Sequence, residues 1–433
     1  MSDNNTTTNN QSSILLLLFT LTTFFFYNAT SVTYYTDITV LKLLKQSISP
    51  NSLTPGSCIS SWDFSYDPCD SLFSDKFTCG FTCDRVNSSN ITRVTELGLD
   101  QASYSASLSS IPWNNLQFLR SLDLTGNAFH GNIPDSLSNL TRLTRLVLSR
   151  NSLSGSIPDS LSQLGALEEI YLDYNSLVGP IPGSFRGLRG LKRVELQGNQ
   201  LSGEFPDLSR LTQLEFLDTS ENLITGRVPT NLPSSLTEIS MRKNLLSGDL
   251  PGEILRNLPF LQVLDLSFNQ LSGLISASFF THSVLQQVSL SNNKLTSIEV
   301  PSGLGADSGL IAIDLSNNEL SGLLPGFMGL MPKLSALTLE NNKFMGLIPT
   351  TYALKMVWAE PGVVPFERLL LGGNYLFGPI PDPLMKLEPG STRINLVDNC
   401  LLVCPNTVFF CQGGDQKSVV ECRTSLGPVI PYN

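Results

Sequence analysis

The chain has 433 residues, of which 41% are hydrophobic and 15% are charged, with a formal net charge of −10 at pH 7 and a pI of about 4.8. This hydrophobic content excludes wholesale disorder. The acidic balance argues against a nucleic-acid partner, because phosphates require a basic face. The sequence contains two histidines, His130 and His282, which are too few to favour His-based catalysis or a His-rich metal site.

An apolar run, ILLLLFTLTTFFF at residues 14–26, is the first predicted element. It is too short to span a bilayer comfortably and matches a signal-peptide core. The small-residue stretch NATSVT follows, so we assign residues 1–31 to a signal peptide cleaved near Ser31. The residues before the run contain no Lys or Arg, which leaves an N-terminal anchor as the alternative. No second apolar run follows, so we predict a secreted protein of the extracellular space or cell wall, or one peripheral at the plasma membrane.

Eight cysteines form two groups of four, separated by a long stretch that contains none. An even count in a secreted chain predicts disulfides that staple two terminal caps, at residues 32–93 and 400–433. Two zinc sites are the alternative, but the spacing lacks the paired C-x-x-C that such sites use, so no metal is expected. Each group allows three pairings, which spacing does not rank. The eight are Cys58, Cys69, Cys79, Cys83, Cys400, Cys404, Cys411 and Cys422.

The middle of the chain repeats itself. LTRLVLSRNSLSGSIP (143–158) is followed by LEEIYLDYNSLVGPIP (167–182), and the shared pattern L-x-x-L-x-L-x-x-N-x-L-x-G-x-I-P is that of leucine-rich repeats. A degenerate first unit, VTELGLDQA (94–102), has Ala102 where Asn belongs, so we predict about thirteen units over residues 94–399. The asparagines are spaced by 22 to 25 residues, with one interval of 32, and are Asn127, Asn151, Asn175, Asn199, Asn222, Asn244, Asn269, Asn293, Asn318, Asn342, Asn374 and Asn399.

Each repeated position has a physical role. In x-L-x-L-x the leucines point to one face of a short strand, and stacked strands make a continuous core. The Asn amide satisfies backbone groups that the turn leaves unpaired, so the asparagines should form a ladder. Glycine suits a positive-φ position, and Ile-Pro keeps the chain extended. The predicted fold is a right-handed α/β solenoid with a parallel concave sheet, a convex side of short strands, turns and 3₁₀ helices, and disulfide-stapled caps.

One unit is longer than the others. TTYALKMVWAEPGVVPFERL (350–369) inserts about eight residues between regular coils. Long loops in compact arrays are often functional, and this one could present Tyr352 and Trp358. The interpretation that we favour is a tolerated bulge whose Trp358 packs on the convex side.

The L-x-G-x-I-P segment resembles the plant-specific repeats of receptor kinases, receptor-like proteins and polygalacturonase-inhibiting proteins. The stretch TDITVLKLLKQSI (36–48), followed by SWDFSYDPCD and CGFTCD, looks like the N-terminal cap of that class, with a short amphipathic helix. The resemblance implies a Cys69–Cys83 bridge and an additional Cys58–Cys79 bridge. The stretch NCLLVC…CQGGDQKSVVECR is similar to the C-terminal cap of plant extracellular repeat proteins, including leucine-rich repeat extensins.

The x positions of each strand face the concave side, and their chemistry changes along the array. Aromatic and Arg side chains, the types that carry binding energy at interfaces, gather with opposite charges between Arg145 and Arg242. We predict this stretch as the partner surface; the alternative is a polar face whose cross-strand charge pairs add solubility. The predicted binding residues are Arg145, Glu169, Tyr171, Asp173, Arg193, Glu195, Phe216, Asp218, Glu238 and Arg242.

Glycosylation is expected at the N-x-[ST] sequons of Asn87, Asn90 and Asn139. Catalysis is not expected, because G-x-S-x-G, H-E-x-x-H and phosphate-loop motifs are absent from the sequence. Acid pairs such as Asp173 with Glu195 could approach each other across strands, but the repeat template itself supplies an acid in nearly every unit. No cofactor is predicted.

The resemblance implies a secreted, non-enzymatic recognition module acting in cell-surface signalling or defence. Expected partners are an extracellular peptide or protein, including a membrane receptor kinase, or a cell-wall polysaccharide or glycanase. Two alternatives are an inhibitor of secreted pectin-degrading enzymes and a structural cell-wall protein.

Overall fold

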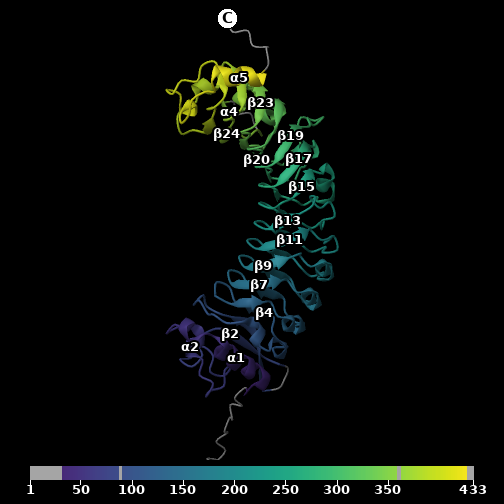
Figure 1. Ribbon diagram of the computed structural model, residues 1–433, viewed down its shortest axis with the longest axis vertical. Coiled ribbons are helices and arrows are strands. Elements are labelled where there is room, and N and C mark those ends of the chain that lie inside the picture. The colour runs from purple at the N-terminus through teal and green to yellow at the C-terminus, as the bar shows by residue number, and fades with distance from the viewer. Residues whose placement is uncertain (1–31, 87–89, 358–361, 427–433) are drawn as a thin grey trace, which may run out of the picture.

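The computed structural model describes residues 32–86, 90–357 and 362–426, so the predicted signal peptide lies outside the described part of the chain. The chain forms a curved solenoid with a cap at each end, as predicted (Figure 1). Within the described ranges, no helix is long and apolar enough to cross a membrane.

A 15-stranded sheet lines the inner side of the arc (Figure 1). Fourteen of its strands are parallel, and the remaining one, β2 (Phe81–Arg85), pairs antiparallel with β3 (Ile91–Gly98). Each repeat contributes one short strand, and successive strands pair in parallel without slipping in register, as in Leu146↔Ile170 and Val194↔Leu217. These four side chains point inward and are buried, which is why the leucine positions alternate with polar ones. The parallel strands are β1 (Val32–Thr33), β3 (Ile91–Gly98), β4 (Ser121–Asp123), β6 (Arg145–Val147), β8 (Glu169–Tyr171), β10 (Arg193–Glu195), β12 (Phe216–Asp218), β14 (Glu238–Ser240), β16 (Val263–Asp265), β18 (Gln287–Ser289), β20 (Ala312–Asp314), β22 (Ala336–Thr338), β24 (Arg368–Leu370) and β26 (Arg393–Asn395).

The outer side of the arc carries short strands and 3₁₀ helices, as predicted (Figure 1). The strands form three smaller parallel sheets: β5 (His130–Asn132), β7 (Ser152–Ser156), β9 (Ser176–Gly179), β11 (Gln200–Glu204) and β13 (Leu223–Thr225); β15 (Ser247–Asp249), β17 (Gln270–Ile275) and β19 (Lys294–Ile298); β21 (Ser321–Leu323), β23 (Lys343–Gly346), β25 (Tyr375–Gly378) and β27 (Cys400–Leu401).

Of the ten 3₁₀ helices in the described ranges, six begin directly after the Pro of an Ile-Pro or Leu-Pro pair. The α-helices are α1 (Tyr35–Ser47), α2 (Cys58–Ser61), α3 (Ser278–Thr281), α4 (Thr350–Val357) and α5 (Val419–Leu426). The 3₁₀ helices are η1 (Pro50–Ser52), η2 (Leu108–Ser110), η3 (Trp113–Asn115), η4 (Asp135–Asn139), η5 (Asp159–Gln163), η6 (Gly183–Gly187), η7 (Gly252–Asn257), η8 (Gly326–Leu330), η9 (Leu384–Lys386) and η10 (Phe409–Cys411).

The repeat glycine is required by the neighbouring coil as well as by its own backbone. Gly155 has φ of +75°, and a Cβ there would lie 2.5 Å from Asn132 Oδ1 of the preceding unit. Gly346 has φ of +90°, and a Cβ there would lie 2.5 Å from Leu323 Cδ2. Glycine therefore permits both the left-handed backbone and the close stacking of successive coils.

The asparagine ladder is present. In the central rung, Asn269 Nδ2 donates to the backbone oxygens of Leu266 and Ser267 in its own unit, at 3.1 and 3.2 Å, and to Met241 in the preceding unit, at 3.0 Å. Asn269 Oδ1 accepts the backbone N–H of Leu246, also in the preceding unit, at 3.0 Å. Because Asn269 is buried, each rung satisfies backbone groups that water does not reach and ties two coils together.

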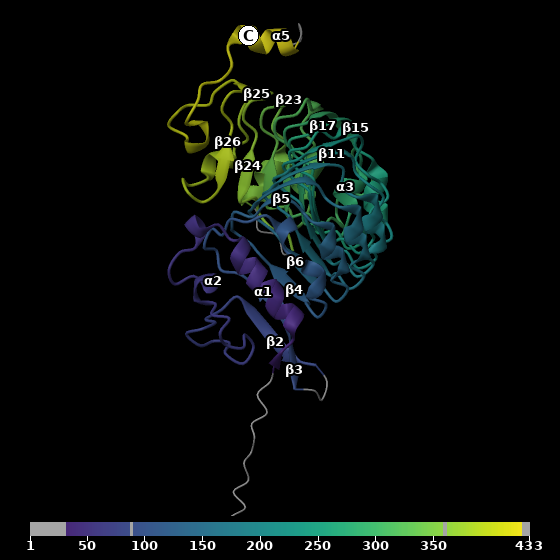
Figure 2. The same cartoon turned by 60° about the horizontal axis from the view of Figure 1, so that its bottom comes forward.

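The N-terminal cap is held to the array by a buried ion pair and contains two disulfides. α1 lies across the first end of the array (Figure 2), and its buried Asp37 carboxylate accepts two hydrogen bonds from Arg93 at 2.9 Å each. The bridges are Cys58–Cys79 and Cys69–Cys83, the pairing that the resemblance implies.

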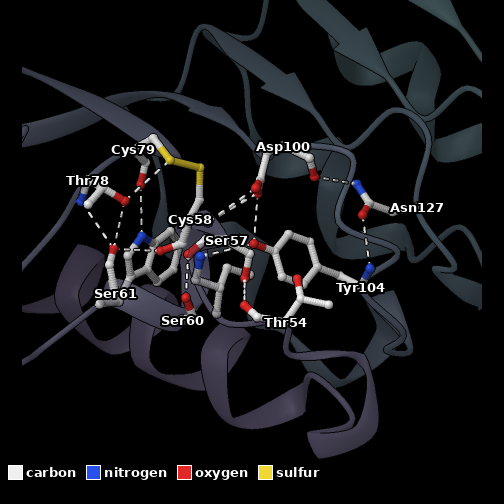
Figure 3. Close-up of a disulfide and its surroundings, with 12 residues drawn as sticks. Thr54, Ser57, Cys58, Ser60, Ser61, Thr78, Cys79, Asp100, Tyr104 and Asn127 are labelled. Atoms are coloured by element: carbon white, nitrogen blue, oxygen red, sulfur yellow. Dashed lines mark hydrogen bonds between the residues drawn. A yellow bond between two sulfur atoms is a disulfide. The ribbon is translucent and has the colours of Figure 1, made fainter.

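The first coil is joined to this cap by Asp100, Tyr104 and Asn127, which lie between the Cys58–Cys79 bridge and the array (Figure 3). Asp100 Oδ1 accepts the Tyr104 hydroxyl proton at 2.7 Å, and that hydroxyl accepts the backbone N–H of Ile59 at 3.0 Å. Burial raises the pKa of Tyr104 to about 12, so the hydroxyl stays neutral and can donate. Asp100 is therefore part of the cap as well as a concave position.

The C-terminal cap supplies one more rung of the ladder, from a glutamine. Gln416 Nε2 donates to the backbone oxygen of Leu396 at 3.1 Å, and its Oε1 accepts the N–H of Leu401 at 3.2 Å. These are the bonds that the Asn of a following unit would make. The bridges Cys400–Cys422 and Cys404–Cys411 hold this segment against the last coil.

The long unit folds inward, which rules out the presentation of Tyr352, one of the two interpretations of this segment. Residues 350–357 form α4, in which Tyr352 is fully buried and its hydroxyl donates to the backbone oxygen of Pro325 at 3.0 Å. Trp358 lies outside the described residues. Lys355 is also buried, with Nζ 2.6 Å from the Met331 backbone oxygen and 5.3 Å from the centroid of the Phe366 ring. The insertion therefore extends the core.

We expect Asn269→Ala to lower the free energy of unfolding by roughly 2–4 kcal/mol, because the loss of the side chain leaves several buried backbone groups unpaired. Asn231→Ala, at an exposed position, should change it little. Urea unfolding followed by circular dichroism measures both. Equal stability of the two variants would contradict the role of the ladder.

Lys355→Met should stabilise the fold at pH 7. Burial lowers the pKa of Lys355 from 10.5 to about 8, so between these values the unfolded chain binds more protons, and stability rises with pH. The gain from the substitution, about 1–3 kcal/mol at pH 7, should shrink by pH 10. Thermal unfolding at both pH values tests this, with the exposed Lys386→Met as control. A gain of the same size at both pH values would show that the charge of Lys355 is not its cause.

Candidate recognition surface on the concave sheet

Strand register brings most of the predicted binding residues into neighbouring rows. Arg145, Glu169, Arg193, Phe216 and Glu238 occupy one row across five consecutive strands, because each is paired in register with the next. A second row runs through Tyr171, Glu195 and Asp218. The side chains of the two rows are partly exposed. Arg145 and Glu238, which are 93 positions apart in the chain (238 − 145), thus share one continuous face.

Arg145 is the centre of the first cluster. Its Nη1 lies 3.0 Å from Asp123 Oδ2, and its Nε lies 3.1 Å from Glu169 Oε2. Glu169 Oε2 also accepts the Tyr171 hydroxyl proton at 3.0 Å, and the Arg145 guanidinium lies 5.2 Å from the centroid of the Tyr171 ring. These contacts hold an amphipathic Tyr ring in place on an exposed sheet, and a side chain that is already ordered loses less entropy in an interface.

Arg193 organises a second cluster beside the first. Its guanidinium lies 3.6 Å from the centroid of the Phe216 ring, and its Nε donates to Glu195 Oε1 at 2.6 Å. Gln197 Nε2 donates to Glu195 Oε2 at 3.1 Å. The Gln197 side-chain oxygen is buried and accepts no hydrogen bond among the described residues. The cluster therefore contains a fixed aromatic ring and an acceptor that lacks a donor.

Asp173 is the exception among the predicted binding residues. It is only 6% exposed, and the Ser149 hydroxyl donates to its carboxylate. Burial is the largest cause that raises the pKa of Asp173, and the nearby Glu195 charge adds to the rise. Asp173 is therefore too enclosed to serve as a contact residue.

Asp218 is partly exposed and carries an unfavourable charge. Burial raises the pKa of Asp218, and the charges of Glu195 and Asp265 raise it further, while hydrogen bonds from Ser220 act in the opposite direction. Arg242, the last predicted binding residue, is exposed and turns toward the sheet edge, where it stacks on Phe268 at 4.8 Å from the ring centroid.

The flank beside the sheet carries aromatic residues that the sequence analysis did not select. Tyr174 and Phe268 stand directly before ladder asparagines, have positive φ, and are 42% and 43% exposed. Arg150 stacks on Tyr174 at 4.5 Å from the ring centroid, and a Cβ on Gly198 would lie 2.6 Å from Tyr174 Cδ1. The sequence could have identified these two residues, because each occupies the position before a ladder Asn, and that position points sideways rather than into the core.

Two of the three predicted glycosylation sites can be located on the structure. Asn90 and Asn139 are exposed, whereas Asn87 lies outside the described residues. As for metals, the described part of the chain contains no group of three His, Cys, Asp or Glu residues that could hold an ion.

Comparison with known proteins agrees with the repeat fold. A family model described as Leucine rich repeat matches residues 117–177 and 283–344, and a second one matches residues 260–281. Receptor-like protein 41 of Arabidopsis thaliana is 36% identical over 120 residues, which are 27% of this chain and 13% of that protein. Receptor-like protein 7 of the same plant is 35% identical over 117 residues, 27% of this chain and 12% of that protein. The chain is a plant-type extracellular leucine-rich repeat protein.

Solved structures place this leucine-rich repeat protein beside plant receptor ectodomains. The plant peptide hormone receptor RGFR1, in complex with RGF2, superposes with a TM-score of 0.61 at 27% identity, over 75% of this chain and 56% of that one. A TDR receptor superposes with a TM-score of 0.55 at 26% identity, over 71% of this chain and 60% of that one. The match thus spans about an eighth of the curated receptor-like proteins and just over half of these receptor chains.

Asp218→Asn should stabilise the leucine-rich repeat protein at pH 7. The raised pKa of Asp218 means that its ionised form weakens the fold once pH exceeds that value, whereas below 3.8 the carboxyl is neutral in both states. Asn keeps the acceptor for the Ser220 N–H. Unfolding midpoints at pH 7 and pH 3 should show a gain only at pH 7, while the exposed Asp307→Asn should show none. A lower unfolding midpoint for Asp218→Asn at pH 7 would contradict the inference that the ionised Asp218 weakens the fold.

Proposed function

We propose that this leucine-rich repeat protein is a non-enzymatic recognition module whose concave face binds an extracellular peptide or an extended segment of a protein. The observation that carries the proposal is the pair of clusters around Arg145 and Arg193, which hold Tyr171 and Phe216 in fixed positions on an uncovered sheet. Aromatic and Arg side chains of this kind dominate the energetics of protein interfaces.

The shape of the surface favours an extended partner. The binding rows cross consecutive strands, so contacts recur at about 4.8 Å along the array. A partner that lies along the arc meets both clusters, whereas a compact partner touches few strands at once. RGFR1, which shares this fold, is a peptide hormone receptor solved with RGF2, and this supports a peptide as the partner class.

The chemistry supports binding rather than catalysis. The carboxylates nearest the clusters are already engaged: Glu169 by Arg145 and Tyr171, and Glu195 by Arg193 and Gln197. A general acid or base needs a pKa near the working pH and a reactive group within reach. Two ion-paired carboxylates on an open sheet do not provide this arrangement.

The test is capture of ligands from extracellular fluid by purified protein, quantified by mass spectrometry. The triple variant Arg145→Ala, Tyr171→Ala and Phe216→Ala should reduce capture of the wild-type ligand set at least about tenfold, because hot-spot residues each contribute more than about 1 kcal/mol. A matched control, Arg210→Ala with Phe260→Ala, removes exposed residues of the same types outside the concave rows. Undiminished capture by the triple variant would contradict the proposed surface.

A further inference from the structure

The second half of the concave sheet carries a regular series of carboxylates. Asp218, Asp265 and Asp314 stand in one row, and Ser240 and Ser289 occupy the same row on the strands between them. An acid therefore recurs on every second strand from β12 to β20. This series, the Asp row, begins beside the Arg193 cluster and continues away from it.

Each acid of the Asp row has one occupied oxygen and one available oxygen. Oδ1 accepts the backbone N–H of the residue two positions later: Ser220 at 2.8 Å, Ser267 at 2.9 Å and Ser316 at 3.0 Å. This bond fixes the side chain on the sheet. None of the three carboxylates has a Lys or Arg within ion-pairing distance in the described part of the chain, in contrast to Asp123, Glu169 and Glu195.

The surface next to the Asp row leaves room for a ligand and supplies no countercharge. Val263, Gln287 and Ala312 occupy the adjacent row on β16, β18 and β20. The exposed Arg242, two residues after Ser240, stacks on Phe268 instead. Charge complementarity therefore calls for a cationic occupant.

The spacing of the Asp row selects the conformation of that occupant. Two strand separations amount to about 9.6 Å. A polyproline II segment advances about 9.3 Å in three residues and returns to the same face. Same-face residues of an extended β-strand recur at about 6.7 Å, and a helix repeats a face over seven residues at about 10.5 Å, so both match the spacing of the acids less closely.

We propose that the Asp row binds a polypeptide segment in the polyproline II conformation that presents a Lys or Arg at every third residue. The segment lies along the arc, with one cation at each of Asp218, Asp265 and Asp314, and its end reaches the Arg193 cluster. This inference rests on the proposed function and names the charge, conformation and residue period of the partner.

The direct test uses synthetic peptides and fluorescence anisotropy at low salt. The probe is Lys-Pro-Pro repeated four times, and the control is a peptide of equal length and equal Lys count in which the lysines are adjacent. The wild-type protein should bind the period-three peptide at least about tenfold more tightly, and its affinity should fall as salt is raised. Equal affinity for the two peptides would overturn the proposal.

Protein variants test the acids themselves. Asp265→Asn with Asp314→Asn keeps the hydrogen bond to the backbone, as Asn395 does naturally when it accepts the Val397 N–H at 3.1 Å. This variant should lose at least about tenfold in affinity for the period-three peptide, whereas the exposed Asp249→Asn with Asp307→Asn, off the concave face, should lose less than about twofold. Retained affinity in the first variant would contradict the Asp row as the site.

The test of the Asp row can fail while the test of the proposed function succeeds, and the reverse is also possible. If natural ligand capture depends on Tyr171 and Phe216 but the period-three peptide shows no preference, the recognition face stands and the Asp row proposal fails. If the peptide binds through Asp265 and Asp314 while natural capture ignores Tyr171 and Phe216, the Asp row stands and the aromatic clusters are not the recognition surface.

Discussion

The buried asparagine ladder is the interaction on which the rest of the molecule depends. Each rung satisfies backbone groups of its own coil and of the coil before it, as Asn269 does with Leu246 and Met241. The leucines supply the hydrophobic driving force, and their alternation opposes a one-residue slip, but apolar contacts are not directional and do not align individual backbone groups. The rungs are directional, and a coil displaced by one residue would leave buried backbone groups unpaired. The ladder therefore sets the register of the long sheet.

Fixed register is what gives the concave face its chemistry. Side chains from equivalent positions line up in rows. Each substituted position of the repeat therefore lies about 4.8 Å from the equivalent positions of the two neighbouring strands. Near Arg145 and Arg193 the rows hold ion pairs and aromatic rings, and farther along they hold carboxylates and serines. One backbone thus presents two chemically different stretches on the same face.

Much of this architecture could be predicted from the sequence, because a repeat is stabilised by short-range rules. The strand positions, the Asn ladder, the glycines and the caps follow from the pattern, and the observed cysteine pairs at the first cap match the family resemblance. The features that the sequence did not predict are contacts that do not recur from one repeat unit to the next. Gln416 completes the ladder from a distant loop, Tyr352 turns into the core with α4, and Asp173 is covered by its neighbours. The repeat pattern does not describe such contacts, since each depends on three-dimensional proximity.

The most direct measurement of the central claim is photo-crosslinking from a single position on each face. A photoreactive phenylalanine replaces Tyr171 on the concave sheet in one protein, and the exposed Arg186 in the convex helix η6 in another. With extracellular fluid as the source of ligand, the account predicts crosslinked partners from position 171 and none above background from position 186. Crosslinks from position 186 alone would place recognition on the outer side of the arc and contradict the account.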